Sequence, residues 1–173
     1  MRVAAIYDIH GNLPALEAVL QDIRQAGVNH VVVGGDVILG PMPRETLTCL
    51  LDLDIPVQFI QGNCDREVLA RMRGTETGTV PEQFREVVRW VAQQLHPEHE
   101  QLLARWPKTL RVEIRGLGEV LFAMLHREAT LRYLPVLRLK TASYQSLKDS
   151  TYLWSSAVIP TCSLTARSEG FEL

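Results

Sequence analysis

Short apolar runs alternate with segments of helical length through the first third of the chain, and this alternation limits the possible folds more than any other feature. Three runs of strand length lie at residues 3–7, 30–33 and 56–60. Three segments with helical features follow them, at residues 13–26, 44–53 and 65–72. Strands that alternate with helices pair in parallel, because each helical connection returns the chain to the same end of the sheet. The sequence therefore predicts an α/β fold with a parallel sheet.

The rest of the chain divides into two parts of different character. Two helices opened by prolines and a β-hairpin are expected at residues 81–95, 97–106, 109–114 and 120–125. Ten of the 11 glycines come before residue 123, and residues 141–168 are rich in Ser and Thr without a sustained apolar period. We therefore predict one domain over residues 1–122 and an aberrant or poorly ordered tail over residues 123–173.

Composition excludes several functional classes. The chain is 46% hydrophobic and 22% charged, as in soluble globular proteins, and its net charge of -2 argues against a large basic surface for nucleic acid. No apolar stretch approaches the about 20 residues that a membrane helix needs, and the N-terminal run is too short for a signal peptide. We therefore expect a cytoplasmic protein with no membrane partner. The 3 cysteines are widely spaced and do not indicate a disulfide framework.

Three polar clusters carry the candidate chemistry, and each directly follows a predicted strand. They read DIHGN at residues 8–12, GGD at 34–36 and GNCD at 62–65. The carboxyl ends of parallel strands gather along one edge of a sheet, which is where ligands bind. The side chains expected to converge there are Asp8, His10, Asp36 and Asn63. Two carboxylates, an imidazole and an amide oxygen suit a borderline metal ion such as Mn²⁺, Zn²⁺ or Fe.

Each cluster alone has an ordinary structural explanation. Asp8 and Asp36 are suitable caps for the helices that follow them. His10 on its own is an unremarkable loop histidine, and Asn63 fits a turn that needs left-handed backbone. The order of all three clusters, each behind a strand, favours the metal site over these separate explanations.

The series D-x-H, G-D and G-N-x-D, each after a strand, resembles the calcineurin-like metallophosphoesterases over residues 1 to about 122. The GNCD form is similar to a branch of small bacterial and archaeal phosphodiesterases. The resemblance implies an α/β sandwich with a metal site at the strand ends. It also implies that Asp8 and His10 bind one metal, that Asp36 bridges two metals in the catalytic centre, and that Asn63 binds the second.

The resemblance assigns supporting roles to three more residues. Asn12 and Asp65 are expected to support the ligands or to touch substrate. Cys64 occupies the position where many members place a histidine that assists the leaving group. The implied cofactors are two divalent ions, with Mn²⁺ preferred and Zn²⁺, Fe or Ni²⁺ as alternatives, and they activate a hydroxide for in-line attack. The implied substrate is a small phosphoester or nucleotide-type molecule. Whether the chain forms a homo-oligomer is left open.

The chain departs from the family in its last third. The later histidine motifs, CHATP or HGxP and then GHTH, do not occur, and His126 lies near the expected place in a different context, AMLHRE. His30, His96 and His99 match no family position. A site that lacks half its ligands binds metal weakly, so we expect the activity of this chain to be impaired.

A one-base slip of the reading frame after Phe122 accounts for both the lost motifs and the unusual tail. The tail codons, read one base earlier, permit the strings CHATPRSDTEIFT and VVVCGHTHMQFDR, in the family order. On this hypothesis the second sheet of the sandwich lacks its later strands.

Two other interpretations stay open at this point. One is a non-catalytic protein that binds phosphate or nucleotide at the partial metal site. The other is a doubly wound nucleotide-binding domain without metal, although neither a G-x-G-x-x-G nor a Walker motif occurs at the first strand-to-helix turn.

Overall fold

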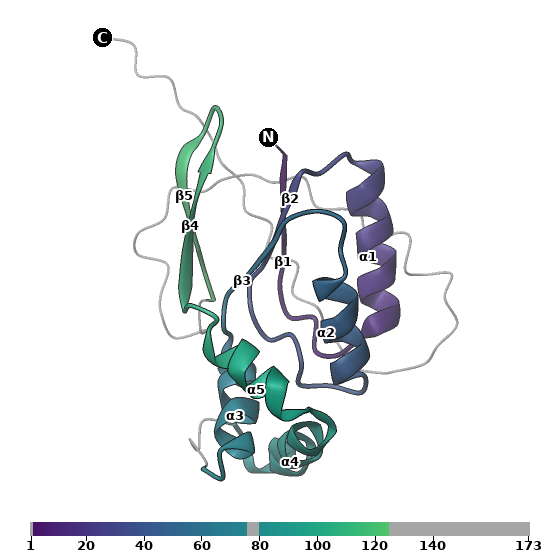
Figure 1. The fold of residues 1–173 in the computed structure, drawn as a ribbon, viewed down its shortest axis with the longest axis vertical. Coiled ribbons are helices and arrows are strands. Elements are labelled where there is room, and N and C mark those ends of the chain that lie inside the picture. The colour runs from purple at the N-terminus through teal and green to yellow at the C-terminus, as the bar shows by residue number, and fades with distance from the viewer. Residues whose placement is uncertain (1, 76–79, 125–173) are drawn as a thin grey trace. The chain divides into compact units, whose positions relative to one another are not determined.

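A computed structural model of the protein describes residues 2–75 and 80–124 (Figure 1). His126 and residues 125–173 lie outside the described residues, so what the sequence predicts for them stays a prediction. Among the described residues, no helix combines the length and hydrophobicity needed to cross a bilayer. The expected cytoplasmic location is likewise still a prediction.

The centre of the fold is a three-stranded parallel sheet in the order β1-β2-β3, formed by β1 (Val3–Ile6), β2 (His30–Val33) and β3 (Val57–Phe59). The register pairs Val3 with His30 and Val31 with Val57. Helices α1 (Leu13–Gln25) and α2 (Pro43–Leu51) connect these strands. The predicted α/β fold with a parallel sheet is therefore confirmed.

The two faces of this sheet pack against different partners, because side chains alternate along each strand. Val31 and Val33 belong to the large core that includes the buried faces of the helices, among them Leu16 and Leu20 of α1. Val32 points the other way, into a smaller core with the hairpin formed by β4 (Thr109–Ile114) and β5 (Gly118–Ala123). The result is the layered α/β sandwich that the sequence predicts.

Three further helices complete the large core next to the carboxyl ends of the strands (Figure 1). They are α3 (Asn63–Met72), α4 (Arg85–Gln94), which a 3₁₀ turn η1 (Glu82–Phe84) precedes, and α5 (Pro97–Ala104). Helix α3 packs against both α4 and α5. Trp106, just after α5, stacks on Phe59 of β3 with the ring centroids 4.7 Å apart, so the helical group is joined to the sheet.

The predicted start of the third helix is wrong by two residues. The sequence places this helix at residues 65–72, but it begins at Asn63 and Gly62 is its N-cap. Asp65 is the third residue of the first turn, where its side chain accepts a hydrogen bond from the Gly62 N–H at 3.0 Å. A carboxylate at this position satisfies the free N–H groups of a helix start as well as an N-cap does, and spacing alone does not separate the two.

Strand β1 forms one edge of the parallel sheet as described. Within residues 2–75 and 80–124 it pairs only with β2, and all four of its residues are partly exposed, whereas Val31, Val32 and Val33 of β2 are fully buried. Parallel strands are normally covered on both sides.

Candidate metal centre

The loops that follow β1 and β2 remain hydrogen-bonded beyond the ends of the strands. Asp8 N–H donates to Gly35 O at 3.2 Å, and His10 N–H donates to Asp36 O at 2.9 Å. Gly11 N–H donates to Val37 O at 2.8 Å. These bonds extend the parallel pairing by several residues, and they place Asp8 and His10 beside Asp36 although at least 26 residues separate them in sequence.

The three residues nearest the centre of this edge have left-handed backbones. The φ angles are 54° at Asp8, 49° at His10 and 54° at Asp36, and these are the only non-glycine residues with positive φ among those described. Such a conformation costs on the order of 1–2 kcal/mol per residue, although Asp and His tolerate it better than most residues do. Backbone strain of this kind concentrates at functional sites, where the surrounding structure enforces it.

At Asp36 the carboxylate of Asp65 supplies that enforcement. It is fully buried, and it accepts hydrogen bonds from the backbone N–H groups of Asp36 and Val37, each at 2.9 Å. It also accepts from Ile38 at 3.3 Å and from Gly62 at 3.0 Å. One side chain thus ties the second loop to the third. Asp65 lies behind Asp36, where it positions the backbone of the site.

Burial raises the pKa of Asp65 to about 6, and the negative charge of Asp36 acts in the same direction. The hydrogen bonds from the Gly62, Val37 and Ile38 backbones lower it. A cation beside Asp36 would favour the ionised form of Asp65, because it would offset the repulsion between the two carboxylates.

The third loop brings Asn63 and Cys64 next to the carboxylate of Asp36. Cys64 N–H donates to Asp36 Oδ1 at 2.9 Å. The Asn63 Nδ2 donates to Cys64 Sγ at 3.4 Å; with the amide turned over, it donates instead to Asp36 Oδ2 at 3.3 Å and its oxygen accepts from Cys64 N at 3.3 Å. A Cβ on Gly62 would lie 2.0 Å from Asp36 Oδ1, so the close approach of the two loops requires glycine there.

His10 is oriented by a backbone carbonyl. Its Nδ1 lies 3.2 Å from Leu39 O, and because a carbonyl only accepts, Nδ1 carries the proton and donates. The Nε2 atom then has a free lone pair, and it lies 3.8 Å from Asp8 Oδ1. Histidines that bind metals are held in this way, with one ring nitrogen on a carbonyl or carboxylate and the other free for the ion.

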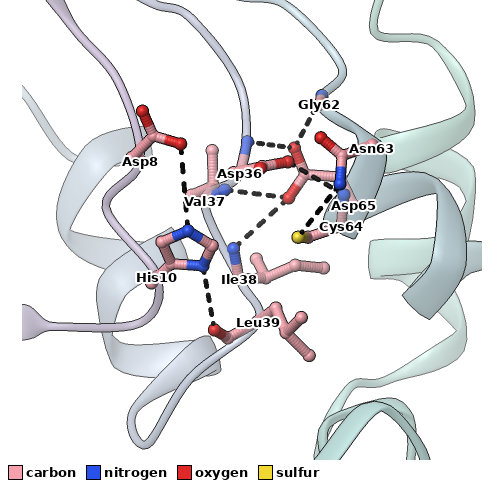
Figure 2. Close-up of polar contacts among 10 residues, drawn as sticks. All are labelled: Asp8, His10, Asp36, Val37, Ile38, Leu39, Gly62, Asn63, Cys64 and Asp65. Atoms are coloured by element: carbon pink, nitrogen blue, oxygen red, sulfur yellow. Dashed lines mark hydrogen bonds and ion pairs between the residues drawn. The ribbon is translucent and has the colours of Figure 1, made fainter. Parts of the chain in front are cut away.

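A nitrogen, an oxygen and a sulfur atom that can each bind a metal come together in the space between these loops (Figure 2). One ligand atom from each of His10, Asp36 and Cys64 lies within 4.8 Å of the other two. Burial raises the pKa of Asp8, as does the nearby Asp36, whereas His10 lowers it. Burial also strongly raises the pKa of Cys64, with Asp36 adding both its charge and a hydrogen bond. The site thus combines nitrogen, oxygen and sulfur donors with a surplus of negative charge. Both features suit the binding of a divalent cation.

The structure contradicts the simplest alternative for the two aspartates. The N-cap of α1 is Asn12, whose side chain accepts from Ala15 N–H at 3.2 Å, and the N-cap of α2 is Met42. Neither Asp8 nor Asp36 therefore caps a helix. The side-chain bond of Asn12 gives this residue a structural task at the entrance to α1 rather than a place among the converging donors.

The other described histidines lie elsewhere. His30 Nε2 is 2.7 Å from Gln58 Oε1 on the neighbouring strand. His96 and His99 stand at the start of α5, where the His96 N–H donates to His99 Nδ1 at 3.1 Å. Sequence reasoning placed Cys64 in a supporting position and did not count it among the metal donors. The only sequence signal for its position near His10 and Asp36 is its place in GNCD, directly after Asn63.

Comparisons with known proteins agree with this arrangement. The family model for the calcineurin-like phosphoesterase superfamily domain matches residues 1–152. An uncharacterized protein of Methanocaldococcus jannaschii is 39% identical over 70 residues, which are 40% of this chain and 28% of that protein. Phosphodiesterase YfcE of Escherichia coli K12 is 35% identical over 77 residues, which are 39% of this chain and 42% of YfcE. The chain thus matches less than half the length of either relative.

One solved structure supports the fold. A hypothetical protein from Pyrococcus horikoshii superposes with a TM-score of 0.58 at 23% identity, over 69% of this chain and 52% of that one. At this identity the likeness concerns the fold alone.

Proposed function

The chain belongs to the calcineurin-like phosphoesterase superfamily, and from this premise we propose that it is a metal-dependent phosphodiesterase scaffold whose activity is impaired. One observation supports this most: Asp8, His10, Asp36 and Asn63 come from three separate loops and meet at one edge of the sheet. The choice of phosphodiesters follows from one similar protein, phosphodiesterase YfcE.

The proposed ligands divide between two divalent ions. Asp8 and His10 would hold one, Asn63 would hold the other, and the Asp36 carboxylate would be available to both. Divalent ions in such a site supply a water of lowered pKa and neutralise charge on the phosphate. We propose Mn²⁺ as the preferred ion, with Zn²⁺, Fe or Ni²⁺ as alternatives.

The protein's own contribution is to hold these donors in place. The Leu39 carbonyl keeps the proton of His10 on Nδ1, and the Asp65 carboxylate fixes the backbone of Asp36. The His10 side chain is 42% exposed and that of Asp8 is 25% exposed, so His10 is the more accessible of these two proposed ligands.

Impairment follows from the ligands that this sequence lacks. The family's later histidines are absent from the sequence, and the described histidines other than His10 lie outside the site. Loss of ligands weakens metal binding and turnover, because the remaining donors leave coordination positions to water.

The proposal is tested by hydrolysis of bis-p-nitrophenyl phosphate during titration with Mn²⁺. We expect low, metal-dependent activity that falls at least about 10–100-fold in Asp36→Asn. Asp54→Asn, a change of an exposed aspartate outside the site, is the matched control and keeps the wild-type rate. Metal binding without turnover would instead support a non-catalytic phosphate- or nucleotide-binding protein. Equal rates in the wild type and in Asp36→Asn would contradict the proposed site.

We also propose that the altered tail arose from a one-base change of reading frame after Phe122. The support is that both missing motifs can be written in one shifted frame and in the family order. The matched family model continues to residue 152, so the change would fall inside the matched region. Sequencing the gene around the Phe122 codon tests this directly, and an unshifted frame there would refute it.

A further inference from the structure

Cys64 is placed where a metal ligand would be. Its sulfur, at the start of α3, is directed toward the loop that carries Asp36 (Figure 2). It forms one mutually close group with a ring nitrogen of His10 and a carboxylate oxygen of Asp36, all within 4.8 Å of one another. No other group of three such donors within this distance occurs in residues 2–75 and 80–124.

We propose that the Cys64 thiolate is a direct metal ligand, and that it forms with His10 and Asp36 a nitrogen–oxygen–sulfur site selective for Zn²⁺ over Mn²⁺. This inference rests on the proposed metal site, adds a ligand to it, and replaces the preference for Mn²⁺ that the family resemblance implies with a preference for Zn²⁺. The site would compensate in part for the later histidine ligands that the sequence lacks.

The geometry needs only a small adjustment. A tetrahedral zinc ion, with bonds of about 2.0 Å to N and O and about 2.3 Å to S, has its donors about 3.3–3.5 Å apart. The observed limit of 4.8 Å then requires a contraction of at most about 1.5 Å. The His10 side chain is 42% exposed and has room to rotate toward the sulfur. Three protein donors leave one position open for water or a phosphate oxygen.

Without metal, burial and the charge of Asp36 raise the pKa of the Cys64 thiol, so the charge of the bound cation itself would stabilise the thiolate. Cys64 is the second residue of α3, and the N-terminal end of a helix stabilises negative charge. In its better-satisfied orientation the Asn63 amide donates to Asp36 Oδ2 at 3.3 Å rather than to the sulfur, and the backbone N–H of Cys64 donates to Asp36 Oδ1 at 2.9 Å. Binding converts the thiol to a thiolate: the S–H bond breaks, a sulfur–metal bond forms, and one proton passes to the buffer.

Metal preference follows from the softness of sulfur. Thiolate ligands favour Zn²⁺ and similar ions, whereas Mn²⁺ and Mg²⁺ prefer oxygen donors. A site with only oxygen and imidazole donors, as the sequence alone indicates, already binds Zn²⁺ more tightly than Mn²⁺, and a thiolate ligand widens this difference. The two ligand sets therefore differ in a property that can be measured without any assay of activity.

The test is a titration of the full chain with Co²⁺, which substitutes for Zn²⁺ and is visible by absorption. We expect an ultraviolet sulfur-to-cobalt charge-transfer band in the wild type. The band should persist in the double variant Cys49→Ser/Cys162→Ser, where Cys64 is the only cysteine left. It should vanish in Cys64→Ser, with Co²⁺ affinity lowered about 10–100-fold. The Zn²⁺ concentration that displaces bound Co²⁺ should be lower than the Mn²⁺ concentration, and Cys64→Ser should narrow this difference.

The possible results distinguish failure of the proposed thiolate ligand from failure of the proposed metal site. Cobalt binding that Asp36→Asn abolishes, but without the charge-transfer band in the double variant, would overturn the thiolate ligand and leave the metal site standing. No cobalt or manganese binding at all would overturn both. The double variant decides the question even if Cys64→Ser fails to fold, because it leaves Cys64 unchanged.

Discussion

The two sides of the central sheet are stabilised in opposite ways. The hairpin side is a small apolar core, formed by Val32 and Ile60 of the parallel layer with Val112, Ile114 and Phe122 of the hairpin, and its residues have ordinary backbone angles. The carboxyl edge is polar, holds three strained residues, and is tied together by one buried carboxylate, Asp65. Apolar packing spreads stability over many contacts, whereas the polar edge concentrates it in a few hydrogen bonds.

This contrast indicates which part of the molecule couples the free energy of unfolding to metal affinity. A change in the hairpin core should lower the free energy of unfolding and leave metal binding intact. A change at the polar edge should lower both, because the same hydrogen bonds that stabilise the loops also position the proposed ligands. The predictions below test this distinction, beginning with the largest expected effect.

Asp65→Ala should have the largest effect on both quantities. It leaves the N–H groups of Asp36, Val37, Ile38 and Gly62 without their acceptor. We expect a loss of about 3–5 kcal/mol in the free energy of unfolding, the range for breaking a buried charged network. Denaturant unfolding measures the loss, and titration with Co²⁺ should show weaker binding. Asp65→Asn, which keeps one acceptor oxygen, should lie between. Unchanged Co²⁺ affinity in a folded Asp65→Ala would break the proposed coupling.

Gly62→Ala should come next. The added Cβ would lie 2.0 Å from Asp36 Oδ1 and 2.3 Å from Asp36 N, so the loop must move. We expect a loss of about 3 kcal/mol, at the upper end for overpacking, together with weaker metal binding. The control is Gly74→Ala, where nothing lies within 4 Å of the added Cβ but φ is +75°. It should cost only about 1 kcal/mol of backbone strain and leave metal affinity unchanged. Equal effects on metal affinity in the two variants would count against the argument.

Val112→Ala tests the apolar side. Val112 is 9% exposed and packs in the hairpin core. Removing two methyl groups should cost about 2 kcal/mol, from lost burial and from the cavity left behind. The same unfolding and Co²⁺ titrations apply, and here the affinity should match that of the wild type. A fall in affinity comparable to that of Gly62→Ala would mean that the two sides of the sheet are not independent.

The smallest effect should come from pH at the start of α5. Burial lowers the pKa of His99, and the charges of His96 and Arg44 act in the same direction, although Glu98 opposes them. The folded state therefore binds fewer protons than the unfolded state. Stability from this group is fully present above the unfolded pKa, about 6.5, and is lost as pH falls through the lowered folded pKa.

His99→Gln should reduce this dependence, because Gln keeps an acceptor for the His96 N–H but does not titrate. Unfolding free energies measured between pH 7 and pH 5 should fall more for the wild type than for the variant. Metal binding at pH 7 should be equal in both, since α5 takes no part in the site. Parallel pH profiles would show that His99 does not contribute.

Much of the site was predictable because parallel strands end at a shared edge. Asp8, His10, Asp36 and Asn63 each follow a strand, so their convergence follows from topology alone. The supporting contacts were not predictable in the same way. The bond of His10 to the Leu39 carbonyl spans 29 residues, and the bonds of Asp65 to the second loop span 27 to 29. Spacing in the chain carries no information on distances between separate loops.

The sequence by itself determined the order of strands and helices, the two faces of the sheet, and the identity of the polar residues at its edge. Periodicity and turn residues specify these features locally. Only the tertiary structure decided that Asp65 faces the backbone, that Asn12 caps a helix, and that the Cys64 sulfur joins His10 and Asp36. Hydrogen bonds and metal ligation act over about 2–3 Å, so they depend on how the separate loops are placed after the sheet has formed.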